Sequence, residues 1–235
     1  YLLDGAYVLH KRRYQETSLI LQLLTRSRGR VSCIAKGALR KGSKLSGVLE
    51  PLCLLHIETK GKSSLKTLIS AEVSYRHPEL IKDRLFAVFY MNELIVKLTA
   101  ENDALADLFE RYSRSIESLS EEGDIEPVLR GFEVSLLNEL GFGLNLTSDA
   151  ASGRCITAES NYVYDLELGA KKINIPSETL TIKGSTLLAL AGKRRYQATE
   201  AREAKQLMRR VIQHYLGDRK IESRELFRSS VDRLD

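Results

Sequence analysis

The chain has 235 residues, of which 43% are hydrophobic and 29% are charged, and its formal net charge at pH 7 is +5. These values are typical of a soluble globular protein, and the length predicts two or three domains. No apolar run approaches the roughly 18–20 residues of a membrane span, and no signal peptide pattern opens the sequence. The 3 cysteines are too few and too scattered for a disulfide framework, so we expect a cytoplasmic protein with reduced thiols.

The charge is distributed unevenly along the chain. Residues 1–77 carry 14 Lys or Arg against 5 Asp or Glu, residues 78–192 carry 10 against 19, and residues 193–235 carry 12 against 7. A basic segment followed by an acidic one favours a polyanionic partner, most often nucleic acid, bound mainly at one end.

Five strand-like runs occupy the basic segment, at about 3–10, 18–25, 30–36, 52–58 and 65–73. The third run alternates as a half-buried strand does, with Val31, Cys33 and Ala35 on one face and Arg30 and Lys36 on the other. Five short strands in so short a segment suit a small closed barrel, for which the OB-fold is the commonest five-stranded solution.

Polar turns connect these runs. Residues 27–29 close the second run onto the third, and residues 60–63 close the fourth onto the fifth. Residues 37–44 combine Gly and Ser with Arg and Lys, which predicts a flexible basic loop.

Helical periodicity replaces the alternation after Pro78. Three apolar faces follow, formed by Ile81, Leu85, Val88, Leu94, Ile95 and Leu98, then by Leu105, Leu108, Phe109, Tyr112, Ile116 and Leu119, then by Leu129, Phe132, Leu136, Leu137 and Leu140. The third helix follows Pro127, and Gly141 is placed to end it. We expect these helices to form an antiparallel bundle.

Residues 142–183 lack a helical pattern and contain the strand-like Tyr162-Val163-Tyr164, while helices resume near 184–191 and at 198–216. The predicted fold class is therefore α+β, with an OB-fold DNA-binding domain at 1–77 and a mainly helical domain at 78–235. Within the second domain we expect an irregular insert at about 142–183 and C-terminal helices packed back on the bundle.

Motifs for catalysis or nucleotide binding are incomplete. Gly61-Lys62-Ser63 resembles the end of a phosphate-binding loop, but the first glycine of that motif would fall at His56 and the tripeptide lies in a hairpin turn. Gly141-Phe142-Gly143 lacks a third glycine and fits a helix cap. The 4 histidines are isolated from one another and from the cysteines. The sequence predicts a binding protein that is no enzyme and needs no cofactor, although a site assembled by folding stays open.

Basic side chains of the first segment are the candidate DNA contacts. They are Lys11, Arg12, Arg13, Arg28, Arg30, Lys36, Arg40, Lys41 and Lys44. Stacking platforms are few there, so binding should depend on phosphate neutralisation and include both single and double strands. The alternative is an ordinary solvated basic surface.

Nine short motifs occur along the chain in an order that is typical of a known protein family. They are Tyr7-Val8-Leu9-His10, Tyr14-Gln15-Glu16-Thr17-Ser18-Leu19, Gly29-Arg30-Val31, Ala35-Lys36-Gly37-Ala38, Leu49-Glu50-Pro51, Tyr90-Met91-Asn92-Glu93-Leu94, Leu129-Arg130-Gly131-Phe132-Glu133, Leu140-Gly141-Phe142-Gly143 and Lys220-Ile221-Glu222-Ser223-Arg224-Glu225-Leu226-Phe227. Each is short, but in this order they resemble the RecO family of bacterial DNA repair and recombination-mediator proteins over nearly the whole chain.

The resemblance implies an N-terminal OB-fold, a central helical domain and a C-terminal element packed back on it. It also implies a protein that binds DNA, anneals complementary strands, engages the C-terminal tail of single-stranded DNA-binding protein (SSB) and works with RecR to load RecA. Such a protein would be cytoplasmic, and associated with the nucleoid when it is bound to DNA.

The family's SSB tail is acidic and ends in an aromatic residue with a free carboxylate. Such a ligand needs an apolar pocket with a cation at its mouth. We expect this site where the second and third helices meet, with Arg130 as the main cation. The candidate residues are Arg130, Arg111, Arg114, Leu108, Tyr112 and Leu129. The alternative is that these are surface arginines beside an ordinary core.

The insert departs from the family pattern. Many relatives carry four zinc-binding cysteines there, of which the first corresponds to Asp149 and the next falls near Ser152, so that only Cys155 remains. Because a structural zinc site needs about four ligands, we predict that the chain binds no metal.

Two other functional classes are alternatives to the recombination mediator. An RNA-binding OB-fold protein acting in translation or ribosome assembly would also use a basic barrel, but would prefer single-stranded RNA to duplex DNA. A hydrolase or nuclease would need an acidic metal cluster, which the basic segment lacks. The motifs within 90–143 and 220–227 favour the recombination mediator.

Overall fold

The structure is a computed structural model that describes residues 2–174 and 181–231. These residues fall into two compact parts, 2–123 with 221–231 and 124–174 with 181–220. Residues 175–180 of the predicted insert, and the terminal residues 1 and 232–235 of the two predicted domains, lie outside the described residues. The predicted domain division between 77 and 78 stays a prediction.

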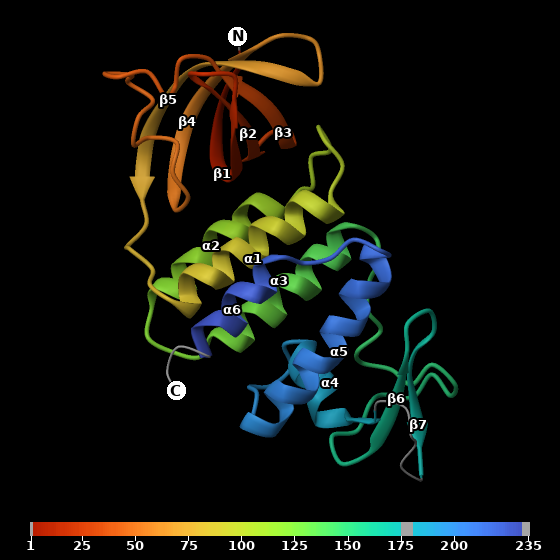
Figure 1. The fold of residues 1–235 in the computed structure, drawn as a ribbon. Helices are drawn as coiled ribbons and strands as arrows, with labels where there is room; N and C mark the ends of the chain where they lie inside the picture. The colour runs from red at the N-terminus through yellow and green to blue at the C-terminus, as the bar shows by residue number, and fades with distance from the viewer. Residues whose placement is uncertain (1, 175–180, 232–235) are drawn as a thin grey trace. The chain divides into compact units, whose positions relative to one another are not determined.

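Five strands form a closed barrel in the first part (Figure 1). They are β1 (Leu2–Tyr14), β2 (Ser18–Thr25), β3 (Gly29–Ala35), β4 (Cys53–Lys60) and β5 (Leu65–Arg76). The order β1-β2-β3-β5-β4 closes β4 onto β1, with β3 parallel to β5 and the other pairs antiparallel. This is the five-stranded barrel expected of an OB-fold, and the α+β fold class is confirmed.

Alternate strand positions fill the barrel. Val31, Cys33 and Ala35 are buried in its core, as the alternation of β3 predicts. Arg30 and Ile34 on the other face are half-buried, whereas Ser32 on that face is buried. Burial raises the pKa of the Cys33 thiol to about 11, which keeps it protonated and unreactive at neutral pH.

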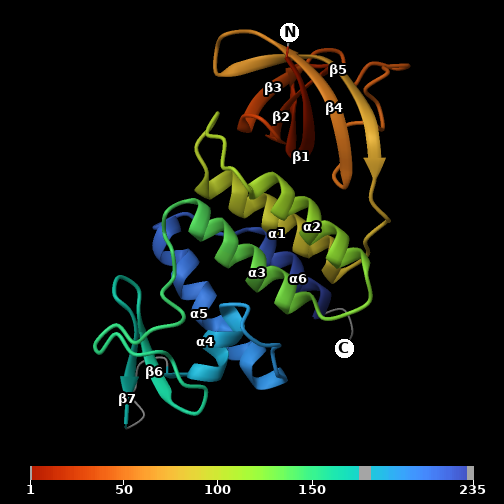
Figure 2. The same ribbon diagram turned by 180° about the vertical axis from the view of Figure 1, so that it is seen from behind.

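The segment between β3 and β4 lies outside the barrel wall in both ribbon views (Figures 1 and 2). Successive backbone hydrogen bonds, from Arg40 to Gly37, from Ser43 to Arg40 and from Ser46 to Ser43, fold it into consecutive turns. Ala38 and Leu49 are buried in the barrel core. The basic segment at 37–44 is therefore a series of hydrogen-bonded turns held by the apolar residues Ala38 and Leu49. Its flexibility stays a prediction.

Three helices complete the first part: α1 (Asp83–Leu98), α2 (Leu108–Ser120) and α6 (Ser223–Val231). Asn92 of α1 donates to the Leu9 carbonyl of β1 and accepts from the Tyr112 hydroxyl of α2, so one buried amide ties barrel and helices together. The carboxylate of Glu93 accepts the backbone N–H groups of Glu222 and Ser223 at 2.8 Å each, which anchors the start of α6 on α1.

The second part contains α3 (Ile125–Glu139), α4 (Gly184–Leu190) and α5 (Ala198–Leu216). The third predicted helix begins two residues before Pro127, because a proline in the first turn loses no intrahelical bond and Asp124 caps the Glu126 N–H at 3.1 Å. Gly141, with φ +80°, ends the helix as predicted, while Phe142 N–H bonds the Leu137 carbonyl. Since α3 and α1 belong to different parts, the predicted three-helix bundle stays a prediction.

A small antiparallel sheet occupies much of the predicted irregular insert. Its strands are β6 (Asn161–Asp165), β7 (Gly169–Ile173) and β8 (Thr181–Lys183), in the order β7-β6-β8. The strand at Tyr162–Tyr164 is confirmed, but the description of the whole insert as irregular was wrong. Strands of five and three residues are too short to show a clear alternation in the sequence.

Candidate nucleic-acid interface

The strand register brings separate basic segments to one end of the barrel. The ladder pairs Arg13 of β1 with Leu19 of β2, and Leu19 with Ala35 of β3. Arg12 and Arg13 therefore lie at the same end as Lys36, which directly follows Ala35.

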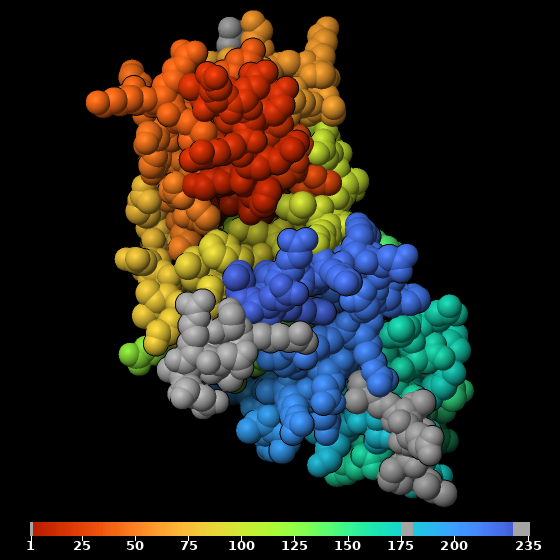
Figure 3. All heavy atoms as spheres, viewed as in Figure 1, coloured from red at the N-terminus to blue at the C-terminus, as the bar shows by residue number. Residues whose placement is uncertain are grey.

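The turns that follow Lys36 are attached at this same end. The Leu39 N–H donates to the Thr17 carbonyl of the β1–β2 turn at 2.9 Å, and the side chains of Leu45 and Val48 pack against the barrel core. In the space-filling view the orange residues of this segment project from the barrel surface (Figure 3). Anchored turns of this kind hold their side chains outward in a fixed array.

Six exposed cations therefore lie at this end of the barrel. We call them the basic end: Arg12, Arg13, Lys36, Arg40, Lys41 and Lys44. Among the ion pairs formed within residues 2–174 and 181–231, none involves these six side chains. Their charge is available to a polyanion without an ion pair of the described residues being broken.

Lys11 lies beside the basic end, but its ammonium group already has an ion-pair partner. Its ammonium group is 2.6 Å from the Glu50 carboxylate and donates to the Leu49 carbonyl at 3.2 Å. Both side chains of the ion pair are more than one-third exposed, so the pair contributes little stability and a phosphate could compete for Lys11.

Arg28 and Arg30 lie at the opposite end of β3 from Lys36. The Arg30 side chain is 13% exposed, and its guanidinium group donates to the Glu101 carboxylate at 3.2 Å and to the Thr99 carbonyl at 2.8 Å. Arg28 is 3.7 Å from the Asp4 carboxylate. Arg30 and Lys36 do share a strand face, but six residues separate them by roughly 20 Å along the strand. The DNA-binding role of Arg28 and Arg30 stays a prediction, and a phosphate would have to replace their present partners.

The residues predicted to bind the SSB tail are divided between the two parts. Leu108, Arg111, Tyr112 and Arg114 lie on α2, with the two arginines exposed and the other two buried, whereas Leu129 and Arg130 lie on α3. Neither part alone assembles them into one pocket, so the predicted tail site stays a prediction.

Arg130 is buried against a carboxylate. Its side chain is 4% exposed and lies 2.9 Å from Glu133, whose side chain is 0% exposed. Burial also raises the pKa of the neighbouring Tyr196, and the charges of Arg130 and Glu133 act on that hydroxyl with opposite signs. Arg130 could meet a peptide carboxylate only if this internal pair opened.

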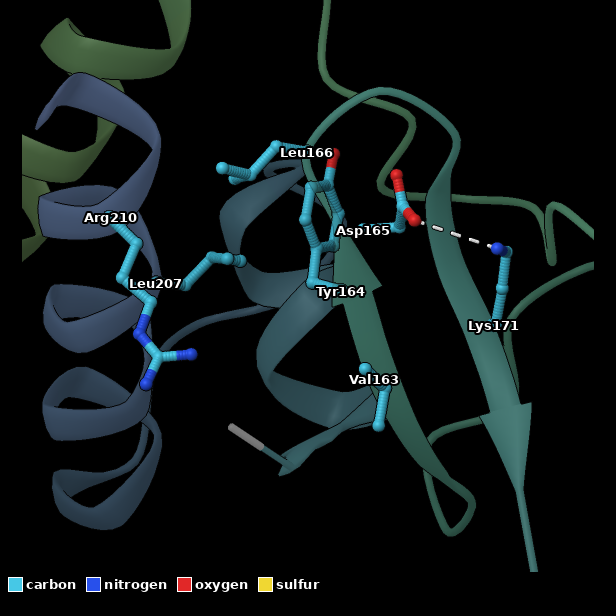
Figure 4. Close-up of a pocket in the computed structure, with 7 residues that line it drawn as sticks. All are labelled: Val163, Tyr164, Asp165, Leu166, Lys171, Leu207 and Arg210. Carbon is cyan, nitrogen blue, oxygen red and sulfur yellow. Dashed lines mark ion pairs between the residues drawn. The ribbon is translucent and has the colours of Figure 1, made fainter. Parts of the chain in front are cut away.

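The second part contains a pocket that no sequence pattern predicts (Figure 4). It has a volume of about 310 Å³ and is lined by Val163, Tyr164, Asp165, Leu166, Lys171, Leu207 and Arg210. The sequence predicts a strand at Tyr162–Tyr164 and leaves the role of Arg210 open, and no local pattern shows that β6, β7 and α5 meet. An arginine on the exposed face of an amphipathic helix was the available signal.

The positions that correspond to zinc ligands in relatives do not fit a metal site. The Asp149 carboxylate accepts the Ala151 N–H and the Ser152 hydroxyl, each at 2.9 Å, and these hydrogen bonds lower its pKa. Over the described ranges, no group of three or more His, Cys, Asp or Glu is placed to hold a metal ion. Hydrogen bonds close this turn, and the absence of metal stays a prediction.

None of the helices in the described part of the chain combines the length and the apolar character needed to cross a membrane.

Two family models match the chain in succession. The model described as Recombination protein O N terminal matches residues 2–76, and the model described as Recombination protein O C terminal matches residues 82–225. A DNA repair protein RecO from Methylococcus capsulatus is 43% identical, over 97% of this chain and 94% of that protein. Proteins of the same name from Aromatoleum aromaticum and Halorhodospira halophila are each 38% identical, over 95% and 97% of this chain and 93% and 97% of their own lengths.

Proposed function

The chain belongs to the RecO family of DNA repair proteins, and from this premise we propose that it is a non-enzymatic recombination mediator. It binds single- and double-stranded DNA through the basic end of its barrel and anneals complementary strands. It engages the C-terminal tail of SSB, and with RecR it helps to load RecA.

One observation supports DNA binding above the others: the basic end carries six exposed cations, and none of them forms an ion pair with a carboxylate of residues 2–174 or 181–231. Such charges bind phosphates and release counterions, so affinity falls steeply with salt whatever the base sequence. Three further arginines of the barrel segment, Arg26, Arg28 and Arg30, already face Glu110, Asp4 and Glu101.

A triple substitution tests this proposal. Replacing Arg40, Lys41 and Lys44 with Ala should weaken binding to every DNA sequence alike and lower the slope of log K against log salt by up to about 3 phosphate contacts. A fluorescence titration of labelled oligonucleotides at several salt concentrations measures both effects.

The matched control removes three exposed cations from the second part, Arg154, Lys193 and Arg195. It changes the net charge equally, so it should leave the salt slope unchanged if the basic end is the contact. An unchanged slope in the first variant would remove the basic end from the DNA interface.

The mediator activity needs a separate assay. Annealing of SSB-coated complementary oligonucleotides should be faster with the protein than without it, and the triple variant should lose this acceleration. Preference for single-stranded RNA over duplex DNA in the same titration would favour an RNA-binding function, and strand cleavage with divalent metal would contradict the non-enzymatic proposal.

A further inference from the structure

An exposed aromatic ring lies among the six cations of the basic end. Tyr14 is the last residue of β1, and its side chain is 39% exposed. No hydrogen bond, ion pair or ring contact of this side chain occurs within residues 2–174 and 181–231. A single exposed ring is ordinary on a protein surface, so its surroundings decide what it can bind.

The strand register places cations on the same face of the barrel as this ring. Arg12 and Tyr14 are two residues apart on β1, so their side chains project to the same side. Tyr14 pairs with Ser18 of β2, and Lys36 directly follows the β3 residue that pairs with Leu19. Leu19 points into the core, so the row of Tyr14, Ser18 and Lys36 points outward. The backbones of Tyr14 and Lys36 are two strand spacings apart, roughly 10 Å.

The turn after Tyr14 joins the ring to the remaining cations. The Thr17 carbonyl in this turn accepts the Leu39 N–H at 2.9 Å, and Arg40 and Lys41 follow Leu39 directly. In OB-folds, oligonucleotides bind on the face of the second and third strands and on the loop between the first and second. Tyr14 lies where that loop begins, with cations on both sides of it.

A ring in such surroundings suits an unpaired base. Stacking on an aromatic ring needs an open base face, which a single strand offers, whereas the bases of a duplex stack on one another. The cations bind the phosphates of either form. An apolar protein partner would bury a contiguous patch with few charges at its centre, whereas charged side chains surround this ring.

We propose that Tyr14 distinguishes single-stranded from duplex DNA, by stacking its ring on an unpaired base while the basic end holds the neighbouring phosphates. The proposal rests on the DNA binding proposed above, and it adds a preference that phosphate contacts alone do not supply. Annealing takes the unpaired base off the ring, so the duplex product is held by its phosphates alone.

Substitutions at two equally exposed rings test this assignment in the full chain. Tyr14→Leu should weaken binding of a labelled thymidine oligonucleotide roughly 5- to 150-fold, as for the loss of one stacked base. Its affinity for a duplex of the same length should change less than about twofold, and its salt slope should equal the parent's, because no phosphate contact is lost. Phe142→Leu removes a ring that is also 39% exposed but lies in the second part, so it should leave both affinities unchanged.

An altered probe and a fluorescent reporter test the chemistry of the contact. An abasic oligonucleotide keeps the phosphates and lacks the bases, so the parent and Tyr14→Leu should bind it equally. Tyr14→Phe keeps the ring and should bind single strands as the parent does. The chain contains no tryptophan, so Tyr14→Trp creates a single reporter whose fluorescence should be quenched when a base stacks on it. Phe142→Trp should show no quenching.

Failure of this assignment and failure of DNA binding give different results. If Tyr14→Leu binds single strands as the parent does, or weakens single strands and duplex alike, the proposal is wrong and DNA binding stands. The same holds if Tyr14→Phe loses as much affinity as Tyr14→Leu, because the hydroxyl group would then be the contact. If the parent binds neither form at low salt, both the proposal and the proposed function are wrong. If Tyr14→Leu lowers the melting temperature, quenching in Tyr14→Trp decides, because that variant keeps a ring.

Discussion

Tyr7 joins three elements through one buried hydroxyl group. The hydroxyl is 3.0 Å from His77 Nε2, just after β5, and 2.9 Å from Ser113 Oγ on α2. Tyr7 and His77 are only 1% and 4% exposed. Burial lowers the pKa of His77, and the negative charge of Glu117 opposes this shift only in part. A neutral imidazole is thus built into the junction between barrel and helices.

This histidine should make the protein less stable in acid. An unfolded histidine takes up a proton near pH 6.5, whereas His77 in the folded protein takes it up only at lower pH. Between these two pKa values the unfolded state binds more protons, so the free energy of unfolding falls as pH drops below about 6.5.

Urea unfolding between pH 7.5 and 5 measures the effect. His77→Gln should flatten the pH dependence relative to the parent, although it also costs stability at pH 7.5. His214→Gln removes an exposed histidine and should keep the parent's slope. Equal slopes for all three proteins would show that His77 is not the group responsible.

In helix α3, a motif that carries the family resemblance contains an ion pair that contributes to the fold. Leu129–Glu133 carries the resemblance, and within it Arg130 and Glu133 form a buried ion pair on successive turns. Breaking one side of such a pair leaves an uncompensated charge in the interior, at a cost of about 3–5 kcal/mol.

Arg130→Ala should therefore lower the free energy of unfolding by about 3–5 kcal/mol. Removing both charges, as in Arg130→Met with Glu133→Leu, should recover much of that loss because no lone charge remains. Chemical denaturation of the two variants and the parent gives the comparison. A fully stable Arg130→Ala would mean that the arginine is a surface group, available to a peptide as first predicted.

The elements that the sequence predicted well are those with long periodic patterns. Alternation located β3, and the helix predicted at 198–216 coincides with α5 (Ala198–Leu216). Two features were hidden: Ala38 and Leu49 anchor turns that look unstructured, and the short strands β6 and β7 carry no clear period. Both depend on contacts between residues distant in the sequence, which no local pattern records.

The sequence showed which basic residues could form the candidate DNA site, but not how they are arranged in space. The basic residues were all visible, but their separation into free and paired groups depends on Asp4 and Glu101, which lie far from Arg28 and Arg30 in the sequence. Two of the motifs that carry the family resemblance do meet in the structure, since Glu93 binds the backbone N–H groups of Glu222 and Ser223. Motif order could not show that contact.

For the whole molecule, the modest net charge of +5 conceals a strongly basic first segment and an acidic middle. Long-range attraction of DNA is then directed to one region, because the acidic middle repels phosphate. Binding that uses the basic end alone involves at most its six cations.

This limit gives a quantitative expectation for the intact protein. Slopes of log K against log salt are about 0.9 per phosphate contact for duplex DNA and about 0.7 for single strands. If both forms of DNA use the basic end, the slopes should not exceed about −5 for a duplex and about −4 for a single strand, with a constant ratio between them. Titrations of matched oligonucleotides between low and moderate salt measure both values. A much steeper slope would mean that a second cationic surface joins the contact, with the exposed arginines of α5 as the first to test by charge reversal.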